Sequence, residues 1–571
     1  MISVLLDVPA ARDAATRLDA LSTLAHDRSA ALRRAAARAH EELPSLAGVP
    51  GWTAGFRARA GDLHARVDLA LAVSGGDEHS LTGPVRYDVL VDDGDATRER
   101  LGTALAELAG LVGPGDDLTP VRRLHERLDR WADDPVVATA LVDALGGPGL
   151  VGLLARCGAL GASGTSPAAR DLPVRLAHLV RRAARTAARS WDDEAEARGR
   201  ALAVTGTAGE RAALSFLVNG GGLPAPVLAG LADALEEHEL VHGVPTGGVL
   251  PGTSWLGLEG ADRHAAVDAA AAVLQSLADT PDAALAWLTG GGAPRLGHWL
   301  RRTWTADGGR RLGDLLSQAT TSWQVLDDPD LDAAAQAARV LDAARLVAAV
   351  LADIDPGATA AGPGLAHVLA TWLHGLDASV NTPVPEPAGR VARGLRDATG
   401  APLPPAPLAA PDRLRVVLRT ALASDEGFAR LRAGLTAHAA GVLRSAAGVG
   451  PTRLADALLA QSALTGLLAA ALDGARRQAW VDLGVARRDS DKDSDGDGWQ
   501  ALLPDLAAYA DRTGGDDDAL GRQLWRQWLV AVARLEGELG TRLTDALDDD
   551  VRDGCTSVFG QATTQTGRSP T

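Results

Sequence analysis

The chain has 571 residues, a net charge of −17 and 46% apolar residues. That length is enough for several domains or one large assembly with an ample core. No Arg-rich run stands clear of acidic neighbours, which argues against a nucleic-acid partner, because such proteins neutralise phosphates with basic side chains. Only two cysteines, Cys157 and Cys555, are present, and this excludes a disulfide framework.

The first part of the chain predicts an N-terminal helical hairpin over residues 1–78, because two long helical patterns meet near residues 43–52. The start lacks a basic segment followed by a long apolar stretch, so we expect no cleaved signal peptide. The longest apolar run, residues 457–472, is shorter than the roughly 20 residues of a membrane span. We therefore expect no membrane span, and either a cytoplasmic location or export by a route that uses no signal peptide.

Residues 79–380 predict a main helical domain. Capping residues precede proline at Asp134-Pro135 and Thr280-Pro281, a pattern typical of helix starts. Gly146-Gly147 and Gly290 predict helix ends. The single strand candidate is Val85–Val91, which predicts a small hairpin or an extended connector.

The last third of the chain begins with a Pro-rich stretch. Prolines gather between residues 381 and 412, and this composition predicts a semi-extended linker. Residues 413–571 predict a C-terminal helical region that contains an acidic loop at 489–498. The whole pattern predicts an all-α fold, with an elongated multi-helix body, an N-terminal hairpin and a C-terminal helical extension.

The stretch His238-Glu239-Leu240-Val241-His242 matches the HExxH pattern of zinc proteases. In that pattern the two histidines lie on one helix face and bind zinc, and the glutamate activates the metal-bound water. The apolar stripe of the predicted helix leads toward His238 and His242, so we expect both histidines to continue the buried face. Glu239 is then the candidate catalytic residue of a zinc-dependent hydrolase.

Four features of the sequence oppose this hypothesis. Glu236 and Glu237 precede the motif, whereas zinc-protease helices usually keep the position two before the first histidine uncharged. No third ligand stands at a family spacing, and only Glu259 and His264 follow nearby. Zinc proteases of this type back the motif helix with a sheet, whereas strands are nearly absent here. Histidines in a last helical turn are also favoured by the helix dipole alone. Metal analysis of protein purified without a chelator, compared with a His238→Ala variant, decides between the two interpretations.

The acidic loop holds a partial calcium-binding pattern. Its aspartates alternate along the loop as in the first positions of an EF-hand, which needs a glutamate at position 12. Leu502 or Pro504 occupies that position, depending on the register. The pattern therefore predicts either weak calcium binding or a solvated loop, and the candidate calcium ligands are Asp491, Asp493, Asp495 and Asp497.

Other chemistry is sparse. No Gly-x-Ser-x-Gly motif or phosphate-binding loop is present. Tryptophans at helical positions are interpreted as core anchors. This set comprises Trp287, Trp299, Trp304, Trp323 and Trp372.

Five helical segments follow one another in the middle of the chain, at residues 133–154, 214–239, 279–290, 362–381 and 414–443. Their order and spacing over roughly residues 130–445 resemble a domain-of-unknown-function family of long all-helical actinobacterial proteins. The family is associated with WXG100-type hairpins, type VII secretion and polymorphic-toxin contexts. The chain departs from the secretion pattern at Trp52-Thr53-Ala54-Gly55, which is one residue longer than Trp-x-Gly, and no acidic residue stands four positions after Tyr87 or Tyr509.

This resemblance implies a non-enzymatic helical scaffold or interaction protein of a secretion- or toxin-associated system. It implies a protein partner and no cofactor. The alternatives are a zinc-dependent hydrolase that uses residues 238–242 and a weak calcium-binding interaction module that uses residues 489–498.

Overall fold

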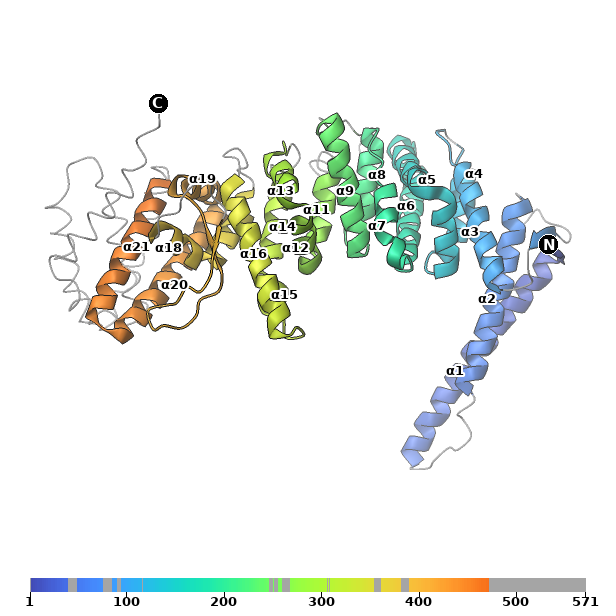
Figure 1. Cartoon of the computed structure of the whole chain (residues 1–571). Helices are drawn as coiled ribbons and strands as arrows, with labels where there is room; N and C mark the ends of the chain where they lie inside the picture. The colour runs from blue at the N-terminus through green and yellow to red at the C-terminus, as the bar shows by residue number, and fades with distance from the viewer. Residues whose placement is uncertain are drawn as a thin grey trace. The chain divides into compact units, whose positions relative to one another are not determined.

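The computed structural model is predominantly α-helical, which confirms the all-α fold class (Figure 1). It divides into two compact units, unit 1 with residues Met1–Val241 and Pro245–Val273, and unit 2 with His242–Val244 and Leu274–Thr571. The structure describes residues 2–39, 49–74, 85–89, 94–115, 117–245, 250, 255–258, 267–304, 307, 309–353, 361–381 and 390–471.

Unit 1 begins with a two-stranded antiparallel sheet. Strand β1 (Ile2–Leu6) pairs with β2 (Val85–Val89), with Val4 opposite Tyr87. The sequence predicted a strand at this second position but not its partner, because the N-terminus lies far away along the chain. Between the two strands, α1 (Val8–Ala39) and α2 (Val49–Ser74) form an antiparallel pair.

The remainder of unit 1 is a succession of helices that pack on one another. Capping residues begin several of them. The carboxylate of Asp134 accepts hydrogen bonds from the backbone N–H of Val136 and Val137 at 3.1 and 3.0 Å. These helices are α3 (Gly94–Gly110), α4 (Thr119–Trp131), α5 (Pro135–Ser163), α6 (Pro167–Ala188), α7 (Ala195–Ala201), α8 (Ala208–Val218) and α9 (Ala225–His242), and α11 (Ala269–Ala278) follows at the boundary with unit 2.

Among the described residues, α5 is the one helix long and apolar enough to cross a membrane by length and composition. Gly146 interrupts it with φ 62° and ψ 175°, and Pro148 follows, so α5 consists of two shorter helices. Its buried side chains pack against α3, α6 and α8. This packing is typical of a helix in the core of a folded unit.

Small residues set the distance between helices in both units. A Cβ atom on Gly230 of α9 would lie 2.1 Å from the carbonyl oxygen of Glu196, and one on Gly199 of α7 would lie 2.1 Å from that of Val227. In unit 2, a Cβ on Gly364 would lie 2.1 Å from the carbonyl oxygen of Gly313. Only glycine permits these backbone approaches.

The described part of unit 2 is also helical and contains one short two-stranded antiparallel sheet. Trp299 and Trp372 are fully buried, as the sequence predicted, but Trp323 is 61% exposed at the start of a four-residue helix. Its helices are α12 (Pro281–Gly290), α13 (Gly292–Arg301), α14 (Arg310–Thr321), α15 (Trp323–Leu326), α16 (Ala333–Asp353), α17 (Gly362–Thr371), α18 (Leu373–Asn381), α19 (Pro411–Leu422), α20 (Asp425–Val449) and α21 (Pro451–Ala471).

The described part of the Pro-rich stretch, residues 390–412, contains the sheet of unit 2. Strand β3 (Arg390–Ala392) pairs with β4 (Ala406–Leu408), and β4 packs against α16 and α18. Ala406 is fully buried. These residues are therefore part of the packed unit, while the proposed limits of the four sequence domains stay predictions.

The α7–α9 contact generates the first prediction. We expect Gly230→Ala to lower the free energy of unfolding by about 1–3 kcal/mol, because the added methyl group meets a backbone carbonyl. The matched control is Gly55→Ala in α2, where a Cβ would meet no atom within 4 Å and alanine favours the helix. Thermal unfolding followed by circular dichroism measures both, and a Gly230→Ala variant that melts like the parent would contradict the packing.

Candidate functional site

The HExxH stretch forms the last turn of α9. Its buried stripe runs through Leu231 and Leu235 to Glu239, which is 6% exposed, whereas His238 is half-buried and His242 is exposed. The burial expected for both histidines is thus found at the glutamate between them. Among the described residues, no three His, Cys, Asp or Glu side chains form a group that could hold a metal ion.

The remaining motif candidates add little chemistry within the described chain. The calcium-loop aspartates at 491, 493, 495 and 497 lie outside the described residues, as do Glu259, His264 and Cys555. Cys157 is fully buried, and burial raises the pKa of its thiol to about 12. A buried thiol with a raised pKa is a packing residue and a poor nucleophile. Zinc and calcium binding remain hypotheses.

One serine–histidine pair was not found from the sequence, because its members are far apart in the chain. The Ser317 hydroxyl lies 2.7 Å from Nδ1 of His367, which joins α14 to α17. Burial, and then the charge of Arg430, lower the pKa of His367. Ser317 is only 4% exposed, so substrate has no access to the hydroxyl, and the pair serves as a hydrogen bond between helices.

Mostly small side chains are buried along the contact between α1 and α2, which we call the seam. The Ser22 hydroxyl donates a 3.1 Å hydrogen bond to the carbonyl oxygen of Thr53 across the seam. Buried positions recur at heptad-related spacing, as in a coiled coil. On α1 they are Val8, Ala11, Ala15, Ser22 and Ser29, and on α2 they are Thr53, Ala60 and Val67.

Large apolar side chains lie outside this seam. Leu21, Leu24 and Leu32 of α1 are 49%, 53% and 50% exposed, and Trp52 of α2 is 69% exposed. Leu21 and Trp52 each precede a seam residue, so the antiparallel arrangement of the helices places them on the same side of the hairpin. We call these four residues the outward flank.

The opposite side of the hairpin is polar. Nε2 of His64 lies 3.1 Å from the Asp19 carboxylate, which links α2 to α1 on that side. Asp19 and His64 therefore mark one side of the seam, and the outward flank occupies the other. Leu69 and Leu71 of α2 are fully buried, so the exposed large apolar side chains in the described part of the hairpin are confined to the outward flank.

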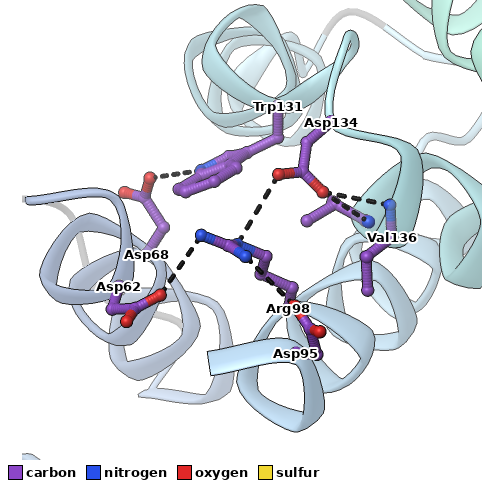
Figure 2. Close-up of polar contacts among 8 residues, drawn as sticks. Asp62, Asp68, Asp95, Arg98, Trp131, Asp134 and Val136 are labelled. Carbon is purple, nitrogen blue, oxygen red and sulfur yellow. Dashed lines mark hydrogen bonds and ion pairs between the residues drawn. The ribbon is translucent and has the colours of Figure 1, made fainter. Parts of the chain in front are cut away.

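Charged contacts fix α2 against the neighbouring helices of unit 1. Figure 2 shows Arg98 of α3 between three carboxylates from three helices. Its guanidinium lies 3.2 Å from Asp62 of α2, 3.1 Å from Asp95 of its own helix and 3.6 Å from Asp134, the residue that caps α5. One arginine thus joins the hairpin to both α3 and α5.

A second contact from α2 is buried. The Asp68 carboxylate, 3% exposed, accepts a 2.7 Å hydrogen bond from Nε1 of Trp131 at the end of α4 (Figure 2). It accepts another of 2.7 Å from the guanidinium of Arg130. A buried carboxylate needs such donors, because burying an unpaired charge is strongly unfavourable. Asp62 and Asp68 thus connect α2 to α3 and α4, the neighbouring helices of unit 1.

No protein-family model matches the chain, and no curated protein matches it. The outward flank of the hairpin therefore stands as the candidate functional site on its own geometry. It is a set of exposed apolar side chains, and it was not singled out from the sequence. The signal that could have found it is a heptad pattern of small residues, with leucines displaced from the seam.

The buried carboxylate generates the second prediction. We expect Asp68→Ala to lower the free energy of unfolding by about 2 kcal/mol, because it leaves the Trp131 N–H and the Arg130 guanidinium without their acceptor. The control is Asp62→Ala, a 38% exposed side chain whose ion pair with Arg98 is worth at most about 1 kcal/mol. Calorimetric melting compares them, and equal effects of the two substitutions would refute the buried anchor.

Proposed function

We propose that this protein is a non-enzymatic helical scaffold that binds a protein partner through the outward flank of its N-terminal hairpin. The observation that carries the proposal is the exposure of four large apolar side chains on α1 and α2. Leu21, Leu24, Leu32 and Trp52 are 49–69% exposed. Single exposed apolar residues are common, but four on one side of a two-helix unit are typical of an interaction surface.

Energetics support this assignment. Fully burying a leucine or a tryptophan contributes roughly 1.5–3 kcal/mol, and each of these side chains keeps about half or more of its surface exposed. Covering all four would contribute on the order of several kcal/mol. Because Asp68 and Arg98 fix the base of the hairpin, less conformational entropy is lost on binding than with a mobile segment.

The proposal extends to an actinobacterial secretion- or toxin-associated system. Its support is the resemblance of residues 130–445 to long helical proteins of such systems, together with the near-exclusive use of arginine over lysine, with Lys492 the sole lysine. A gene neighbourhood without a secretion ATPase or a toxin–immunity pair would contradict this extension. It would leave the binding role of the hairpin intact.

The third prediction concerns the partner. Tagged protein purified from its own organism should retain a partner that is lost from a Leu21→Gln, Leu24→Gln, Leu32→Gln variant, because glutamine keeps the helix and removes the apolar surface. The matched control is Leu240→Gln, a 64% exposed helical leucine on α9. Quantitative mass spectrometry of the eluted proteins measures the loss.

Circular dichroism and size-exclusion chromatography establish that the variants are folded. Retention of every co-purifying protein by the triple variant would refute the outward flank as the binding surface. Loss of the same protein from Leu240→Gln would also refute it, because the effect would not be specific to the hairpin.

A further inference from the structure

The outward flank carries a charge signature as well as an apolar one. We infer that its partner is a carboxylate-rich amphipathic helix that lies lengthwise along α1; this inference rests on the proposed function. Between residues 14 and 38, one side of α1 presents apolar residues and arginines at alternating spacings of three and four, with no acidic residue. These positions are Ala14, Arg17, Leu21, Leu24, Arg28, Ala31, Ala35 and Arg38.

The distal half of the hairpin is strongly basic. Residues 28–39 and 49–61 contain no aspartate or glutamate, although Asp27 and Asp62 flank them directly and the chain as a whole has a net charge of −17. The connecting residues 40–48 add only two carboxylates, Glu41 and Glu42, so the net charge of residues 28–61 is positive. The distal half contains six arginines, and among the described residues none of the six forms an ion pair. They are Arg28, Arg33, Arg34, Arg38, Arg57 and Arg59.

Arg28 is the key cation of the flank. It lies four residues after Leu24 and four before Leu32, so it interrupts the apolar stripe on the same face. Arg17, at the other end, is already paired with Asp13 at 2.7 Å. A partner helix that covers the leucines therefore needs a carboxylate opposite Arg28, because burying the guanidinium unpaired would be costly.

Shape favours a helix as the occupant. The stripe runs from residue 14 to residue 38 along one helix, about 36 Å at 1.5 Å per residue. A helix with apolar residues at heptad spacing follows such a stripe over its full length. A second copy of this hairpin is disfavoured, because its stripe carries no carboxylate to place opposite Arg28, and a parallel overlap would set Arg28 and Arg38 of one copy against those of the other.

The test uses two synthetic probes and the full-length chain. Each probe is a fluorescein-labelled 28-residue heptad peptide with leucine at positions a and d. One carries glutamate at e and g, and the other carries lysine, so like charges discourage self-association of each peptide. We expect fluorescence anisotropy at physiological salt to show at least tenfold tighter binding of the glutamate peptide.

The discriminating variants lie on the same helix. We expect Arg28→Glu to weaken binding of the glutamate peptide at least tenfold, and Arg33→Glu to weaken it less than threefold. Both residues are exposed and both substitutions change the net charge equally, but Arg33 lies on the other side of α1. At physiological salt, interactions between exposed charges are largely screened beyond about 8 Å, so the effects of Arg28→Glu and Arg33→Glu on peptide binding can be told apart. Leu24→Gln should weaken binding of both peptides.

Equal binding of the two peptides, or equal effects of Arg28→Glu and Arg33→Glu, overturns the inference. A second result also overturns the inference. If the protein cosediments with phosphatidylserine-containing vesicles but not with phosphatidylcholine vesicles, and does not bind the glutamate peptide, the occupant is an anionic lipid surface. If a native partner is lost from the triple leucine variant but still binds the Arg28→Glu variant, the proposed function stands and only the inference of an acidic helix fails.

Discussion

The close approach of α1 and α2 is the constraint on which the functional interpretation depends. Alanine and serine occupy the seam, and the Ser22 hydroxyl reaches the carbonyl oxygen of Thr53 across it. Leu18 of α1 is half-buried, whereas the three leucines of the outward flank lie outside the seam and keep about half of their surface exposed. This exposed surface, with the neighbouring arginines, is the binding face that we propose.

The same use of small residues recurs in both units. Gly199 and Gly230 bring α7 against α9, and Gly313 and Gly364 bring α14 against α17. The high alanine and glycine content thus produces helices packed at short distance, with a few tryptophans filling larger spaces. In unit 1, Asp68 and Arg98 add polar contacts between the hairpin and the neighbouring helices.

Local features of the fold could be predicted from the sequence, and long-range ones could not. The capping residue Asp134 before Pro135 predicted the start of α5, and the helical spacing predicted an all-α chain. The pairing of β1 with β2 and the contact between Asp68 and Trp131 join residues distant in sequence, for which no local pattern exists. Periodicity also led toward the histidines of α9, whereas the buried position is Glu239. The hairpin site escaped prediction because alanine and serine give a weak seam signal.

Hydrogen-exchange mass spectrometry of the hairpin, free and with its bound partner, tests the central claim most directly. The account predicts that binding slows amide exchange along residues 14–38 of α1 and around Trp52 of α2, because a partner covering the outward flank suppresses local opening of these helices. Slowed exchange confined to other helices, with the hairpin unchanged, would contradict the account.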